Sequence, residues 1–149
     1  MHSCWHIVLV VPALAVGTAF AGEGAAALRL ELRADRAVYA VGQPLKLMLA
    51  VTNPGPVTIS LTAPSSQFYD FAVLKDGSEV WRWSAEKMFL TVLTQLKISP
   101  RETRTFTERW DQRDRDGRPV GPGDYEVLGI LIGGEQVGLT PGRVHITIR

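Results

Sequence analysis

Few side chains in this sequence have both the type and the spacing that catalysis requires. Nucleophilic catalysis needs a serine or cysteine beside an activating base, and the chain has three histidines and one cysteine. His2, Cys4 and His6 lie at the very start of the chain, while His145 alternates out of phase with the apolar residues around it, which predicts a solvent-facing position. The sequence contains no nucleophile-elbow motif and no phosphate-binding glycine loop. We therefore expect a protein that is not an enzyme.

The closest approach to a metal site is a run of three aspartates that ends in a glycine: Asp111, Asp114, Asp116 and Gly117. Closely spaced carboxylates are ligands that Ca²⁺ prefers. In the frame of an EF-hand loop, however, the first ligand position is Gln112 and the twelfth is Gly123, where that site needs a glutamate. The arginines between the aspartates would also oppose a cation. We expect no metal and no cofactor, and aspartates that cap turns in a solvated loop.

Four aromatic residues near the middle of the chain offer a different chemistry: Tyr69, Phe71, Trp81 and Trp83. On an exposed face they could stack on sugar rings, as in a carbohydrate-binding module. Aromatic side chains also bury large apolar areas, and the remaining sequence supplies mainly leucine and valine to a core. We therefore expect these four side chains to belong to the core.

The strands that carry these aromatic residues are predicted by the turn between them. Asp76-Gly77 is a strong hairpin signal between two runs rich in aromatic and β-branched residues. With these two residues alone in the loop, both faces of the hairpin would mix charge with aromatic surface. A three-residue loop, residues 75–77, with Gly77 in the left-handed region shifts the pairing by one and collects the aromatic residues on one face. We predict this bulged register.

The bulged register makes specific pairs across the hairpin. These are Tyr69 with Trp83, Phe71 with Trp81, and, on the opposite face, Asp70 with Arg82. Val73 lies on the aromatic face. We expect the Asp70–Arg82 pair to be a surface ion pair worth about 0–1 kcal/mol.

Alternating apolar residues predict further strands on both sides of the hairpin. The pattern marks residues 28–33, 45–51, 57–61, 91–98, 103–110, 125–132 and 143–148. Residues 125–132 are apolar on both faces, which predicts a central strand. Short strands separated by frequent turn signals predict a single all-β domain, an immunoglobulin-like antiparallel β-sandwich over residues 28–149. Tyr125, which follows a turn, resembles the tyrosine corner of that fold.

Several of these residues also form a family pattern. It consists of Ser66-Gln67, Tyr69-Asp70-Phe71, Val73 and residues 79–84, preceded by Val51-Thr52-Asn53 and followed by Trp110-Asp111, Asp116-Gly117, Val120, Pro122-Gly123 and Tyr125. The pattern resembles the BsuPI family, named for an intracellular proteinase inhibitor, over residues 28–132. This resemblance implies an immunoglobulin-like sandwich that binds a protein partner, a serine proteinase, and inhibits it.

The first residues predict export. Residues 7–16 are apolar, and Ala19-Phe20-Ala21 fits the signal-peptidase rule, so we expect a cleaved signal peptide over residues 1–21 and a short flexible N-terminus over residues 22–27. The apolar run is shorter than the ~20 residues that span a bilayer, although a retained anchor is the alternative. Cleavage would remove Cys4 and leave a secreted or periplasmic protein that has no disulfide and does not associate with a membrane.

The charge balance argues against a nucleic-acid partner. The chain carries 16 Lys and Arg against 15 Asp and Glu, a net charge of +1. Its arginine-rich stretch, residues 101–118, contains acidic residues throughout, so it forms no basic stripe for a phosphate backbone. We expect a monomer whose partner is a protein.

Loops on a rigid sandwich are the usual place for binding. Three loops could cluster here: residues 63–67, 85–90 and 111–123. The second contains the proposed partner-contact loop, Lys87, Met88, Phe89 and Leu90, which offers an apolar anchor on a polar rim. One alternative is that Phe89 folds back into the core. A second alternative concerns the whole protein, which would then be a non-inhibitory immunoglobulin-like interaction or assembly module of the cell envelope.

Overall fold

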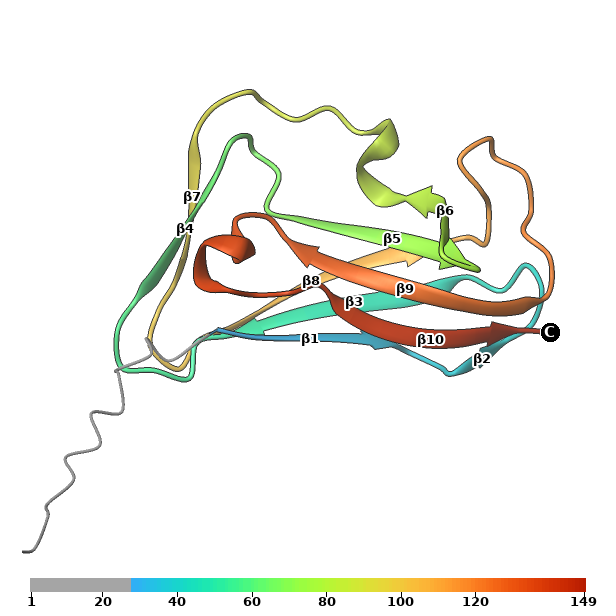
Figure 1. Ribbon diagram of the computed structural model, residues 1–149, viewed down its shortest axis with the longest axis horizontal. Coiled ribbons are helices and arrows are strands. Elements are labelled where there is room, and N and C mark those ends of the chain that lie inside the picture. The colour runs from blue at the N-terminus through green and yellow to red at the C-terminus, as the bar shows by residue number, and fades with distance from the viewer. Residues whose placement is uncertain (1–27) are drawn as a thin grey trace, which may run out of the picture.

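Alternating apolar side chains build two β-sheets that pack face to face, and the computed structural model describes residues 28–149 (Figure 1). One sheet contains β1 (Arg29–Ala34), β3 (Leu45–Thr52) and β8 (Thr103–Trp110). The other contains β2 (Val38–Tyr39), β5 (Tyr69–Lys75), β6 (Ser78–Arg82), β9 (Gly123–Leu131) and β10 (Gly142–Ile148). A separate two-stranded ribbon contains β4 (Ile59–Ala63) and β7 (Thr94–Ile98). The described residues also form two 3-10 helices, η1 (Trp83–Glu86) and η2 (Gly134–Val137).

The strand order confirms the predicted all-β, immunoglobulin-like sandwich. The sheets run β1-β3-β8 and β2-β10-β9-β5-β6, and their pairings are antiparallel except for the parallel β2–β10 pair. Within residues 28–149, no helix has the length and apolar character of a membrane span. The predicted signal peptide, residues 1–21, the flexible residues 22–27 and Cys4 lie outside the described part of the chain.

The sandwich core forms where the inner faces of the two sheets meet. Its fully buried side chains include Leu45, Leu47, Leu49, Phe71, Val73, Trp110, Val127, Ile146 and Ile148. The predicted central strand is confirmed, because β9 lies between β10 and β5. The tyrosine corner is confirmed as well, since the Tyr125 hydroxyl donates a 2.6 Å hydrogen bond to the Gly121 carbonyl. The sequence pattern missed β2, which has only two residues.

The β5–β6 hairpin has a tighter turn than the predicted one. Asp76 and Gly77 form the loop alone, with φ angles of 50° and 79°, and Lys75 pairs with Ser78. The predicted three-residue loop is therefore wrong. The bulge lies at Val80 instead, where the main-chain carbonyl accepts a 2.9 Å hydrogen bond from the Arg115 N–H.

The bulge at Val80 also displaces the predicted pairs. The observed pairs are Lys75–Ser78, Leu74–Glu79, Val73–Trp81 and Ala72–Arg82. The predicted pairs Tyr69–Trp83, Phe71–Trp81 and Asp70–Arg82 are therefore wrong as strand partners. The extra residue nevertheless restores the alternation of faces. Phe71 is fully buried, while Tyr69, Trp81 and Trp83 are half-buried and pack against the core, so the assignment of these four residues to the core face is correct.

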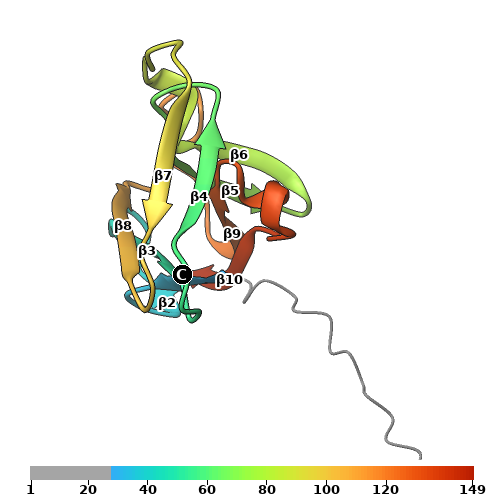
Figure 2. The ribbon, with the colours of Figure 1, turned by 90° about the vertical axis from the view of Figure 1, so that its left-hand side faces the viewer.

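The two connections between the sheets pair with each other. Along the chain, β4 connects β3 to β5, and β7 connects β6 to β8. In space, β4 and β7 pair as an antiparallel ribbon at one end of the sandwich (Figure 2). The ribbon closes a second apolar cluster that contains Leu61, Leu96 and Ile98. The predicted strand over residues 91–98 starts later than expected, because regular pairing begins at Thr94.

A buried asparagine fastens the base of this ribbon. The Asn53 side-chain amide donates to the carbonyls of Val57, at 2.7 Å, and Ile98, at 3.0 Å, while its oxygen accepts the Gly55 N–H. Since Val57 lies before β4 and Ile98 ends β7, one side chain ties both strands to the end of β3.

Candidate protein-contact loop

A buried carboxylate anchors the chain where it leaves β6. Asp70 is only 3% exposed and accepts four hydrogen bonds: from the Phe71 N–H at 2.9 Å, the Ser84 N–H at 3.1 Å, the Ser84 hydroxyl at 2.6 Å and the Arg82 guanidinium at 2.9 Å. The predicted surface ion pair between Asp70 and Arg82 is therefore wrong in character, although the two groups do pair. The bulge places Ser84 beside the carboxylate and closes it off from solvent.

Arg82 connects this anchor to the strand edge. Its guanidinium also bonds Glu79, with a closest distance of 2.7 Å. Hydrogen bonds to Glu79 first, and then to Asp70, raise the pKa of Arg82 above its ordinary value in spite of its partial burial. The network fixes the position at which η1 begins.

An aromatic stack continues from the anchor toward the loop. The Trp83 ring stacks on Tyr69 at 4.6 Å between centroids, and Tyr69 stacks on Phe106 at 4.5 Å. The Tyr69 hydroxyl donates a 2.6 Å hydrogen bond to Glu108. Burial, and then this bond to a carboxylate, raises the pKa of Tyr69 and keeps the hydroxyl neutral. The stacked rings therefore support the chain that follows η1 from below, through Trp83.

The chain after η1 exposes apolar side chains one after another. We call residues 87–93 the contact segment. Its exposed fractions are 99% for Met88, 70% for Leu90, 50% for Val92 and 80% for Leu93. Phe89 is half-buried against Trp83, with ring centroids 5.9 Å apart, so it does not enter the core. Sequence reasoning selected residues 87–90 and missed Val92 and Leu93, because their β-branched and apolar pattern predicted a strand.

Two of the three candidate loops meet at this segment. The Ser66 N–H donates to the Leu90 carbonyl at 3.0 Å, and the Leu90 N–H donates to the Ser66 hydroxyl at 2.9 Å. Residues 63–67 therefore support the contact segment directly. The third loop, residues 111–123, contacts β6 through Arg115 instead.

A groove of about 560 Å³ lies between that third loop and the region around η1. Trp81, Trp83, Lys87, Arg109 and Asp114 are among the residues that line it. Its walls combine indole surface with charges of both signs, so it has no single preference for an anion or a cation.

The aspartate-rich loop behaves as a structural turn. The Asp114 carboxylate accepts hydrogen bonds from the N–H groups of Asp116 and Arg118, both at 2.9 Å, which confirms the predicted capping role. Asp111 is exposed and lies 3.6 Å from the Arg113 guanidinium. Among residues 28–149, no group of three His, Cys, Asp or Glu side chains is arranged to hold a metal ion.

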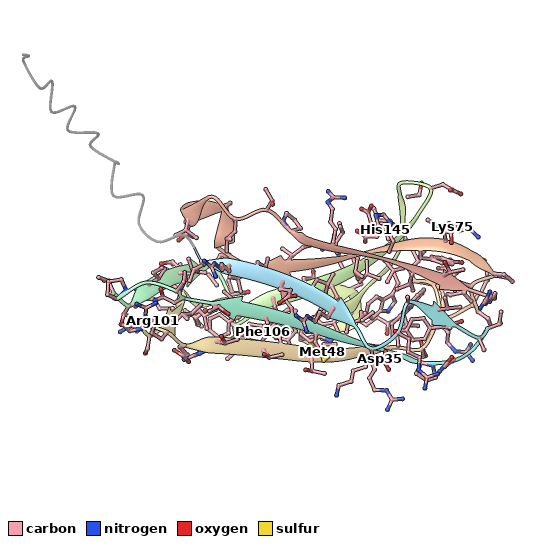
Figure 3. The ribbon with its side chains drawn as sticks, turned by 90° about the horizontal axis from the view of Figure 1, so that it is seen from below. Asp35, Met48, Lys75, Arg101, Phe106 and His145 are labelled. Carbon is pink, nitrogen blue, oxygen red and sulfur yellow. The ribbon has the colours of Figure 1, made fainter. Side chains whose placement is uncertain are left out.

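His145 lies on the solvent face of β10, as predicted. Its side chain is 77% exposed, and its nearest acidic neighbour is Glu126, at 3.8 Å. Figure 3 shows His145 and Lys75 on the side of the five-stranded sheet, away from Met48 on the other sheet. No serine is hydrogen-bonded to this imidazole within the described residues.

Solved structures resemble the chain in fold. A β-glucosidase from Erythrobacter marinus matches with a TM-score of 0.50 and 14% identity over 83% of this chain and 15% of its own. An alkylpurine DNA glycosylase from Pseudomonas fluorescens, bound to DNA, matches with a TM-score of 0.51 and 16% identity over 83% of this chain and 31% of its own. A CARDB domain from Pyrococcus furiosus has a TM-score of 0.47 and 16% identity over 82% of this chain and 87% of its own.

This chain thus spans less than a third of the two enzymes, and identities this low bear on the fold alone. No curated protein matches the chain in sequence. The family model of BsuPI, described as an intracellular proteinase inhibitor, matches residues 32–136, well over half of the chain. That match includes the Asp70 anchor, the hairpin and the contact segment. The chain therefore belongs to the BsuPI family, and its sandwich is a proteinase inhibitor-like domain.

Proposed function

We propose that this protein binds a serine proteinase and inhibits it through the contact segment. The observation that carries the proposal is the exposure of four large apolar side chains within six residues: Met88, Leu90, Val92 and Leu93. A cluster of exposed apolar side chains rimmed by polar residues is a typical mark of a protein-binding site. Membership of an inhibitor family supports a proteinase as the partner.

Contacts with the rest of the domain hold the contact segment in one conformation, which is a property that a proteinase inhibitor needs. A proteinase cuts loops that can adapt to its active site, whereas a loop held in one conformation binds with a smaller loss of entropy. The contact segment is held by the Asp70 anchor before it, by Ser66 at its centre and by β7 after it.

We also propose that the inhibitor acts outside the cytoplasm. The support is the sequence of residues 1–21, with its apolar run and small residues before Gly22. We expect the mature protein to start at Gly22 in the periplasm or the medium. Intact-mass measurement after cell fractionation checks this, and a full-length chain in the cytoplasmic fraction would contradict it.

The inhibitory function is tested by titrating the purified protein into subtilisin-like and trypsin-like proteinases. Residual proteinase activity and the integrity of the added chain are followed together. We expect stoichiometric loss of activity against at least one proteinase, with the chain intact. Unchanged activity across the panel would favour the non-inhibitory interaction module of the cell envelope.

A further inference from the structure

The residues on either side of Met88 point toward the same indole. Lys87 has an extended backbone, with φ −109° and ψ 150°, and its ammonium group lies 4.7 Å from the centroid of the Trp83 ring. The Phe89 ring lies 5.9 Å from the same indole. Successive side chains of an extended segment point in opposite directions. Met88 therefore projects away from Trp83, and its 99% exposure follows from this geometry.

The main chain is fixed on both sides of Met88. Before it, the Lys87 N–H donates to the Ser84 carbonyl at 3.1 Å. After it, both main-chain groups of Leu90 are bonded to Ser66. Within the described residues, no protein group bonds the main-chain N–H or C=O of Met88, so these groups are free to pair with the backbone of a partner.

The other exposed side chains are placed less favourably for insertion into a pocket. The main-chain N–H and C=O of Leu90 are both hydrogen-bonded to Ser66, so neither is free to pair with a partner. Lys87 lies on the Trp83 ring, an interaction worth about 0.5–1 kcal/mol at an exposed site. Val92 and Leu93 lie beyond the Ser66 contacts. Met88 alone combines full exposure with support on both sides.

We propose that Met88 is the side chain that enters the primary specificity pocket of the target proteinase, and that this pocket is apolar. The proposal rests on the inhibitory function proposed above. Methionine is unbranched and apolar, so it fits a deep apolar pocket and leaves the carboxylate of an acidic pocket unpaired. The partner is then a proteinase that cleaves after large apolar residues.

The test exchanges the chemistry of this one side chain in the full protein. Met88→Lys is measured against trypsin, and Met88→Ala and Met88→Leu are measured against a subtilisin-like and a chymotrypsin-like proteinase. We expect Met88→Lys to inhibit trypsin at least about 100-fold more tightly than the original chain. Met88→Ala should weaken inhibition of the apolar-pocket enzymes at least about tenfold, while Met88→Leu keeps it. Val57→Ala is the matched control, since it removes an exposed apolar side chain outside the contact segment, and Leu93→Ala is the comparison within the segment.

The outcomes separate the two proposals. If the original chain inhibits no enzyme but Met88→Lys inhibits trypsin, the inhibitory function is wrong for these proteinases and the placement of Met88 is supported. If the original chain inhibits while Leu93→Ala costs more than Met88→Ala, the placement of Met88 is overturned. A Met88→Lys chain that trypsin ignores, or simply degrades, overturns it too.

Discussion

Replacing Asp70 with alanine is expected to lower the free energy of unfolding by about 3–5 kcal/mol, the usual cost of removing one partner from a buried ion pair. The loss has two parts. Arg82 keeps Glu79 but loses its buried partner, and the N–H groups of Phe71 and Ser84 lose their acceptor. Buried donors left without acceptors account for much of the cost. Urea unfolding followed by tryptophan fluorescence measures the change.

Glu79→Ala is the matched control for this prediction. Glu79 pairs with the same guanidinium but is about one-third exposed, so its removal should cost no more than about 1 kcal/mol. Because Asp70 also holds Ser84 at the start of η1, Asp70→Ala should weaken the proposed inhibition even where the domain remains folded. Equal stability losses for the two variants would show that burial of Asp70 contributes nothing.

Replacing Asn53 with alanine is expected to cost about 2–4 kcal/mol, since a buried carbonyl, a partly buried carbonyl and a buried N–H lose their partners together. The carbonyls belong to Val57 and Ile98, at the two strands of the ribbon, so the loss should loosen β4 and β7 more than the sandwich. Thermal unfolding gives the total change. Amide hydrogen exchange locates it, with faster exchange expected in β7.

A neighbouring polar contact provides the comparison for Asn53. The hydroxyls of Thr52 and Thr103 are 2.7 Å apart in an exposed position, so Thr52→Val should cost less than about 1 kcal/mol. A loss from Asn53→Ala no larger than that from Thr52→Val would contradict the role of Asn53 as the fastening of the ribbon.

Local pattern was sufficient for most of the fold. The alternation of Leu45, Leu47 and Leu49 predicts the buried face of β3, and the apolar character of residues 125–132 predicts the central position of β9. The tyrosine corner followed from a turn and one aromatic residue, because its hydrogen bond spans only four residues. These features depend on periods of two and on nearby contacts, which the sequence displays directly.

The errors arise where distant segments meet. The bulge at Val80 accompanies a hydrogen bond from the main-chain N–H of Arg115, which lies 35 residues further along the chain. The hairpin sequence alone therefore does not predict the bulge. The burial of Asp70 depends on the same shift, which brings Ser84 over the carboxylate. A register derived from the hairpin alone therefore gave the correct faces but the wrong partners.

The candidate loop was predicted in part for a similar reason. Four residues, 87–90, were identified from an apolar run beside charges, and Met88 and Leu90 are exposed as that prediction requires. The β-branched, apolar pattern of Val92 and Leu93 predicts a strand, because this pattern is the same whether or not a partner strand is present. Pairing of β7 starts only at Thr94, opposite Ala63, and this is a property of the ribbon rather than of the local sequence.

Hydrolysis of the peptide bond between Met88 and Phe89 would produce two fragments that remain paired in the same β-sheets. Strands β1 to β6 precede that bond and β7 to β10 follow it. Each sheet joins strands from both sides of the cut: β3 with β8, β5 with β9, and β4 with β7. The two fragments would stay interleaved, with the new carboxyl and amino ends held close enough for the peptide bond to re-form. Under the proposed function, a proteinase that cleaved this bond would therefore still be bound to both fragments of the chain.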